Sequence, residues 1–162
     1  MSIEVRRLLT WDDFQNDVKL HASRHDRGGV DALNWSSVSK FKKNTVTGIS
    51  AVVSGGTLTY TSVLTVDENF YNLIPLSIKV TPSGLATGES LTIYVQVKDQ
   101  DGNTYVIVTK SDVTATTTIT ISDLDFTVLP NGSQIREVLI AAESNQTSTS
   151  ATIDVTIAEI ET

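Results

Sequence analysis

The sequence predicts a mainly β protein: an antiparallel β-sandwich, jelly-roll-like, preceded by a short helical N-terminal arm. From about residue 46 onward, eight or nine short apolar segments follow one another at spacings of about 8–12 residues, separated by turns rich in Gly, Pro, Asn and Asp. Ser and Thr make up about a quarter of the chain, and the β-branched Thr favours strands. An immunoglobulin-like strand order is the alternative to a jelly roll.

The chain divides into an arm, residues 1–45, and a sandwich domain, residues 46–162. The arm holds eight of the twelve Lys and Arg residues and six of the nineteen Asp and Glu residues, so its net charge is +2 and that of the sandwich is −9. An acidic domain can simply be kept soluble by its own charge, or it can receive the basic arm of a neighbouring copy. The four scattered cations of the sandwich form no basic face, so we expect no nucleic acid ligand.

The arm begins with a predicted helix over residues 11–20. Thr10 stands at an N-cap position, and the two aspartates that follow it suit the positive end of a helix dipole. Trp11, Phe14 and Val18 recur at helical spacing and form one apolar stripe. Such a stripe needs a cover, which is either the sheet of this chain or another subunit.

Residues 21–33 are the densest group of polar and glycine residues in the chain, and they hold both of its histidines. Gly28 and Gly29 predict a tight turn that residues with a Cβ atom would resist. Asp31 is placed to cap a second short helix, which would carry Leu33. We expect this segment to be the joint between the arm and the sheet.

A metal site in this segment has little support. His21 and His25 are four residues apart and would share one face of a helix, but the glycine pair interrupts a helix there and the chain contains no cysteine. The simpler interpretation is that these histidines, with Arg24 and Arg27, form hydrogen bonds and ion pairs to Asp31 and to the backbone. We therefore predict no metal and no cofactor, with His21 and His25 as weak candidate ligands only.

The sandwich strands are predicted in order from the apolar runs and the turns between them. Alternation is clearest from Leu91 to Val97, and Asp101-Gly102 then predicts a hairpin. Ser54-Gly55-Gly56 also predicts a hairpin, and Pro75 indicates an edge or a bend. The predicted strand segments are 46–53, 58–66, 70–80, 91–97, 105–109, 119–121 leading towards 126–128, 135–142 and 153–157.

We expect no enzyme. The predicted sandwich has no histidine, so a Ser-His-Asp triad there is impossible. The segment 99–103 resembles a calcium loop only weakly, because the distal Glu of such a loop is missing, and a hairpin turn explains it without a metal. Tyr94 and Tyr105 lie near this hairpin and are candidate glycan contacts, although core packing or cross-strand pairing also explains them.

No run of about eighteen apolar residues is present, so we expect no membrane insertion. The first residues do not form a secretory signal, so the chain is expected to be made in a host cytoplasm and to leave by lysis or assembly.

The segment His21-Ala22-Ser23-Arg24-His25-Asp26-Arg27-Gly28-Gly29-Val30-Asp31-Ala32-Leu33 resembles the H-x-S/T-x-H-x-x-G-G-x-D-x-L/I signature of structural proteins from tailed bacteriophages and some archaeal viruses. The resemblance covers thirteen residues. It implies a homo-oligomeric virion surface component: a tail fibre, spike, turret or capsid decoration. Its partners would be its own copies, other virion proteins and, in a receptor-binding role, a host surface glycan.

Attachment or oligomerisation would fall to the arm residues that carry the apolar stripe and the signature segment. These are Trp11, Phe14, Val18, His21, Arg24, His25, Arg27, Gly28, Gly29, Asp31 and Leu33. The alternative function is a carbohydrate-binding or receptor-binding β-sandwich module, with Tyr94 and Tyr105 at the glycan.

Overall fold

The structure is a computed structural model that describes residues 40–67 and 72–161, while residues 1–39, 68–71 and 162 lie outside the described part. The helices predicted in the arm therefore fall outside the described residues. The compact unit that contains the sandwich spans Ser39–Thr162. In the described part of the chain, no helix is long and apolar enough to cross a bilayer.

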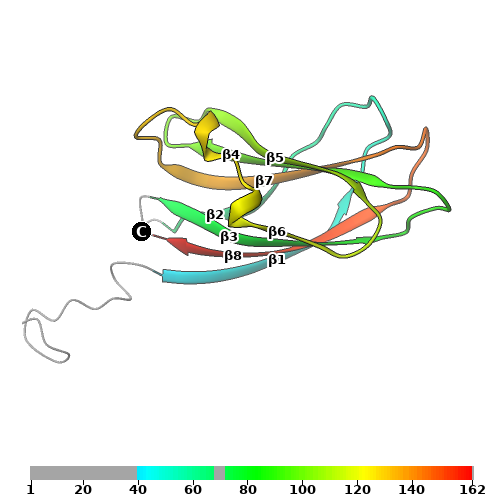
Figure 1. Cartoon of the computed structure of the whole chain (residues 1–162), viewed down its shortest axis with the longest axis horizontal. Coiled ribbons are helices and arrows are strands. Elements are labelled where there is room, and N and C mark those ends of the chain that lie inside the picture. The colour runs from blue at the N-terminus through cyan, green and yellow to red at the C-terminus, as the bar shows by residue number, and fades with distance from the viewer. Residues whose placement is uncertain (1–39, 68–71, 162) are drawn as a thin grey trace, which may run out of the picture. The chain divides into compact units, whose positions relative to one another are not determined.

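Eight strands and two short 3₁₀ helices follow one another in the described residues, and the strands form two layers (Figure 1). Sheet A has the strand order β1-β8-β3-β6, and sheet B has the order β2-β7-β4-β5. Neighbouring strands pair antiparallel in both sheets. The elements are β1 (Lys40–Ser50), β2 (Thr61–Thr65), β3 (Leu73–Ser83), β4 (Leu91–Asp99), β5 (Thr104–Val113), β6 (Thr117–Thr120), η1 (Ile121–Asp123), η2 (Phe126–Val128), β7 (Ile135–Ser144) and β8 (Thr152–Glu161).

The strands pair from the two ends of the domain inward: β1 with β8, β2 with β7, β3 with β6, and β4 with β5. This order results when one long hairpin of four strand pairs is wound into two layers, which is the scheme of a jelly roll. In an immunoglobulin sandwich the first two strands share a sheet, whereas here β1 and β2 belong to different sheets. The predicted β-sandwich is confirmed, and its strand order follows the jelly-roll scheme.

The core lies between the two sheets and is built from alternating side chains. On β4, Leu91, Ile93, Val95 and Val97 are fully buried, while the residues between them are half-buried. This is the period-2 pattern of a strand with one face on the core. The Asp101-Gly102 turn connects β4 to β5 as an antiparallel hairpin, as the sequence predicts.

The prediction of a hairpin at Ser54-Gly55-Gly56 is wrong. β1 pairs with β8 and β2 pairs with β7, so the chain crosses from sheet A to sheet B in residues 51–60. A Gly-rich turn reverses the chain locally. The partner of each strand is decided instead by segments at the far end of the sequence.

The apolar residues after Ile119 do not continue as a strand. β6 ends at Thr120, and Ile121, Phe126 and Val128 belong to η1 and η2. Asp125 stops extension because its carboxylate accepts the backbone N–H of Thr127 at 2.9 Å, which caps η2. The expectation of a strand reaching 126–128 is therefore corrected.

The sandwich begins at Lys40, where β1 starts, and not at residue 46. Residues 40–44 belong to the predicted arm, but Lys42 and Asn44 are register partners of the buried residues Glu159 and Ile157 and therefore share their face of sheet A. Their side chains bond the backbone of β2, which explains how polar residues occupy this face. Asn44 Nδ2 donates to the Val63 carbonyl at 2.7 Å.

Pro75 lies inside β3, at a bend in the part of the strand that pairs with β8 on one side and has no pairing with β6 on the other. Its register partner is Glu159 of β8, whereas β6 pairs with β3 only from Ser77 to Val80. The register between β3 and β8 shifts between Pro75 and Ser77. Because proline has no N–H to give to a second neighbour, it is tolerated at such a position, and the prediction of an edge or bend is confirmed.

Candidate functional site

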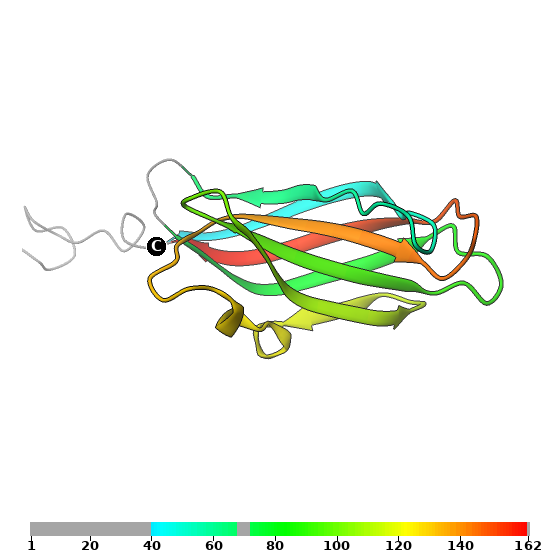
Figure 2. The same cartoon turned by 90° about the horizontal axis from the view of Figure 1, so that it is seen from above.

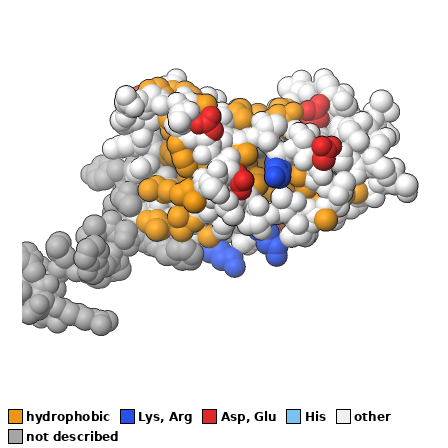
Figure 3. Space-filling view, viewed as in Figure 1, with side chains coloured by type: hydrophobic (Ala, Val, Ile, Leu, Met, Phe, Trp, Pro, Cys, Tyr) orange, Lys and Arg blue, Asp and Glu red, His pale blue; other side chains and the backbone are white. Residues whose placement is uncertain are grey.

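An apolar groove of about 390 Å³ lies between the two short helices, the start of β3 and the start of β7. Figure 2 shows the short helices at one edge of the sandwich, beside β6. In Figure 3, hydrophobic side chains gather on the side of the sandwich that carries these helices. The groove is lined by Asn72, Leu73, Ile74, Ile121, Phe126, Leu129, Pro130, Asn131, Gly132, Ser133 and Ile135.

A capping interaction and a backbone hydrogen bond hold the segment that carries η1 and η2, which forms one wall of the groove. At the start of η1, the carboxylate of Asp123 accepts the N–H of Thr120 at 2.7 Å and its hydroxyl at 2.9 Å. These hydrogen bonds favour the charged form and lower the pKa of Asp123. The N–H of Asp125 donates to the Ile107 carbonyl of β5 at 2.7 Å, which ties the segment between η1 and η2 to sheet B.

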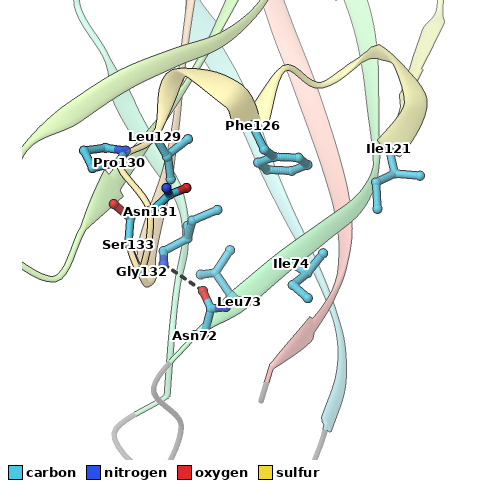
Figure 4. Close-up of a pocket in the computed structure, with 11 residues that line it drawn as sticks. Asn72, Leu73, Ile74, Ile121, Phe126, Leu129, Pro130, Asn131, Gly132 and Ser133 are labelled. Atoms are coloured by element: carbon cyan, nitrogen blue, oxygen red, sulfur yellow. Dashed lines mark hydrogen bonds between the residues drawn. The ribbon is translucent and has the colours of Figure 1, made fainter.

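The rim of the groove is closed by a turn at Pro130-Asn131-Gly132, where the N–H of Ser133 donates to the Pro130 carbonyl at 3.1 Å. On the opposite side, the Asn72 side-chain oxygen accepts the N–H of Ile135 at 2.7 Å (Figure 4). This amide oxygen is thus already engaged in joining the start of β3 to the start of β7.

Several of the large apolar side chains that line the groove are only partly covered, whereas Leu73 and Ile135 are buried. Ile121 is 46% exposed, which is unusual for a large aliphatic residue, and Phe126 and Leu129 are half-buried. Figure 4 shows Phe126 facing the β3 residues Leu73 and Ile74 across the groove. The apolar surface continues on sheet A, where Ile74 and Ile160 are half-buried register partners.

Next to the groove, two glutamates at the end of β8 take inward positions. Glu159 and Glu161 are fully buried and continue the alternation of Ile153, Val155 and Ile157. Lys42 Nζ lies 3.4 Å from Glu161 Oε1 and 2.8 Å from Asp67 Oδ1. The strand predicted from the sequence ends at Ile157, so this arrangement of glutamates is not among the predictions.

The β4–β5 turn engages both carboxylate oxygens of Asp99 with its own residues. Oδ1 accepts the N–H groups of Asp101 and Asn103 at 2.9 and 2.8 Å, and Oδ2 lies 3.3 Å from the Tyr105 hydroxyl. Burial raises the pKa of Asp99, but these hydrogen bonds and those of the Asn103 side chain outweigh it and lower the pKa overall. This geometry explains the segment as a turn, without a calcium ion.

At the other end of the sandwich, Glu89 joins two loops. Its carboxylate accepts the Ala86 N–H at 2.7 Å, the Ser144 hydroxyl at 2.6 Å and the Thr149 hydroxyl at 2.5 Å. The Ala86 hydrogen bond, then those of the two hydroxyls, lower the pKa of Glu89. With every oxygen engaged and the residue 3% exposed, this carboxylate stabilises the loops and offers little to a ligand.

The two tyrosines predicted as glycan contacts lie on opposite faces of sheet B. Tyr105 is the register partner of the buried Val97 and packs against the core, whereas Tyr94 alternates with buried residues and faces outward. They are not cross-strand partners, because Tyr94 is opposite Thr109. A single stacking surface made by both rings is therefore excluded.

Tyr94 instead has Glu143 beside it on the outer face. Its hydroxyl donates to Glu143 Oε2 at 2.9 Å, while Oε1 of the same carboxylate accepts the Gly55 N–H at 2.7 Å. The hydrogen bond to Glu143, with burial and the nearby Tyr60, raises the pKa of Tyr94. Tyr60 is one of several aromatic residues of the sandwich that the sequence offers for sugar stacking, but only the tertiary structure brings it close to Tyr94.

The predicted attachment residues of the arm all lie outside the described residues. This holds for Trp11, Phe14 and Val18, and for the signature residues His21, Arg24, His25, Arg27, Gly28, Gly29, Asp31 and Leu33. In residues 40–67 and 72–161, no group of three or more His, Asp or Glu side chains is arranged to hold a metal ion.

No known protein family and no curated protein matches this chain. Among solved structures, VP2 of infectious bursal disease virus, in a subviral particle, is similar with a TM-score of 0.39 and 11% identity over 75% of this chain and 36% of that one. A mitogen derived from Yersinia pseudotuberculosis has a TM-score of 0.34 and 7% identity over 74% of this chain and 84% of that one. The chain thus spans about a third of the VP2 chain that it matches, and similarity at this level identifies no function.

Proposed function

We propose that this chain is a virion structural protein: its sandwich forms part of a particle's surface, and its N-terminal arm attaches it to its own copies and to other virion proteins. The observation that carries the proposal is the resemblance of residues 21–33 to the signature of virion structural proteins, in a segment that ends seven residues before β1. Segment and sandwich are thus neighbours in one chain.

The strand order of the sandwich supports the same proposal. An eight-stranded jelly roll is used by viral capsid proteins, although lectins and cupins share it, so the fold alone does not select among them. The part of the particle can be a fibre, spike, turret or decoration on the capsid. Each of these needs repeated copies, which is why we propose a homo-oligomer.

The test is whether the chain is part of intact particles. Antibodies against the sandwich are applied to particles purified from the lysed cells that make the chain, and bound antibody is located by immunogold electron microscopy. Labelling at regular positions, with the chain identified by mass spectrometry in the same particles, is the expected result. A chain that stays in the soluble lysate and is missing from purified particles would refute the proposal.

A second candidate function is glycan binding, and the Tyr94–Glu143 cluster favours it. Tyrosine rings stack on sugars, and a carboxylate has lone pairs left for hydroxyl groups after two hydrogen bonds. The discriminating measurement is binding of the full chain to a glycan array. Loss of a signal on Tyr94→Ala but not on Thr118→Ala, an exposed residue of sheet A, would support it, and an array without any signal would exclude it.

A further inference from the structure

We propose that the groove between η1, η2 and β3 receives the apolar stripe Trp11, Phe14 and Val18 of a second copy of this chain. This inference deepens the proposed homo-oligomer and rests on it. It assigns the receiving surface on the sandwich, with Ile121 and Phe126 as its main contacts.

The larger part of the groove's lining is apolar, which suits the apolar face of a helix, and its polar lining residues, such as Asn131 and Ser133, come from the turn at its rim. Ile74, Ile121, Phe126 and Leu129 present carbon surface. The Asn72 oxygen is already engaged with the Ile135 N–H, which leaves this side-chain oxygen less available to orient a polar ligand.

The stripe has the spacing that such grooves receive. Helix-in-groove complexes use anchors at positions i, i+3 or i+4, and i+7. Trp11, Phe14 and Val18 occupy positions i, i+3 and i+7 of the predicted helix. Two of these anchors are aromatic, the residue type that contributes most to interfaces when it fills a pocket.

The place where the described chain begins supports this occupant. Lys40, at the start of β1, and Leu73, in the groove, are both register partners of Glu161 on β8. The chain therefore enters the sandwich two strands away from the groove, at the same end. Residues 21–39, which separate the predicted helix 11–20 from β1, can span up to about 60 Å when extended, which is enough to reach the groove of a neighbouring copy.

Each copy carries one stripe and one groove, so the contact is heterologous, with different surfaces on the two partners. Repeated around an axis it closes a ring. Two complementary defects can therefore be placed in two full-length chains: Phe14→Asp disables the stripe, and Ile121→Asp disables the groove. Ile121 is 46% exposed, so an aspartate there is compatible with folding.

The experiment measures mass in solution by light scattering at micromolar concentration. The unmodified chain is expected to be an oligomer, each variant alone a monomer, and the equimolar mixture of the two variants a 1:1 dimer, because it retains one intact stripe and one intact groove. The control Val106→Asp changes a residue of similar exposure, 40%, that does not line the groove, and it should assemble like the unmodified chain. A mixture that stays monomeric, or a groove variant that still assembles, would overturn the inference.

A second measurement does not depend on how well the aspartate variants fold. The chain has no cysteine, so Phe14→Cys and Ile121→Cys can be combined in one chain and oxidised. The expected product is a ladder of chains linked between copies on a denaturing gel. A disulfide within one chain, or none, contradicts exchange between copies, while the virion proposal is judged separately by the presence of the chain in particles.

Discussion

The side chain of Asn44 on β1 donates a hydrogen bond of 2.7 Å to the carbonyl oxygen of Val63 on β2. These strands are edges of opposite sheets, so this contact joins the two layers where the sandwich would otherwise be open. Lys42, two residues before Asn44 on β1, also joins the two layers, because its Nζ lies 3.1 Å from the Thr65 carbonyl oxygen. Unpaired edge carbonyls are the groups through which strands aggregate, and here two of them are capped by side chains.

Asn44→Leu should therefore destabilise the sandwich. It leaves the Val63 carbonyl without this donor, which typically costs about 1–3 kcal/mol. Thermal unfolding followed by circular dichroism should show a lower Tm, by about 2–4 °C for each kcal/mol in a chain of this size. Lys43→Ala, an exposed neighbour on the outer face, is the control and should leave the Tm nearly unchanged. Equal Tm values for Asn44→Leu and the unmodified chain would show that the contact contributes nothing.

The hydrogen bonds of Glu89 hold two loops together, and we expect this connection to be sensitive to acid. Its folded-state pKa is lowered below the ordinary value of 4.5, so the stabilisation is fully present above that value and is lost as the pH falls from it through the folded pKa. Glu89→Gln should lower the Tm at neutral pH and reduce the acid dependence of the Tm below pH 4.5. The measurement is Tm against pH for both chains. If the curves of Tm against pH run parallel for the two chains, Glu89 is not the source of the acid dependence.

Because the turn itself engages the Asp99 carboxylate, we expect that calcium does not stabilise the β4–β5 turn. Its carboxylate already accepts the N–H groups of Asp101 and Asn103. Adding Ca²⁺, or removing it with a chelator, should leave the Tm unchanged, whereas Asp99→Ala should lower it. A Tm that rises with Ca²⁺ and falls back with the chelator would show that the turn is a calcium site after all.

Truncation of two isoleucines should cost very different amounts of stability. Ile157 on β8 is 1% exposed in the core, and Ile157→Ala should cost about 2–5 kcal/mol. Ile121 in the groove is 46% exposed, so Ile121→Ala should change stability by about 0.5 kcal/mol or less. Urea unfolding of both variants provides the comparison. A large loss of stability for Ile121→Ala would mean that the groove is part of the core instead of a docking surface.

The elements that local pattern predicts well are those whose evidence lies within a few residues. The alternation from Leu91 to Val97 defines β4, and the Asp-Gly turn defines the hairpin to β5, because the two strands that pair are adjacent in sequence. The same kind of evidence misleads at Ser54-Gly55-Gly56. There the turn is local, but β1 finds its partner in β8 at the far end of the chain.

Polar residues on inward faces could not be predicted from the pattern either. Four polar residues share a face with buried apolar neighbours, yet the strands predicted from the sequence stop short of them: Lys42, Asn44, Glu159 and Glu161. A charged or amide side chain is compatible with such a position only when a partner lies within reach, and for Lys42 and Asn44 the partners are carbonyls of β2. Those partners exist only once the two sheets have been stacked.

The sequence by itself determines that this chain forms an antiparallel β-sandwich, because strand periodicity and turn chemistry are properties of short segments. It also places the virion-like signature in residues 21–33, ahead of the first strand. Tertiary structure alone decides which strands pair when they are distant in sequence, which of the tyrosines faces outward, and where the groove opens. The reason is physical: strand pairing and cavity shape depend on contacts between segments that lie far apart in the chain, and no local pattern encodes their distance in space.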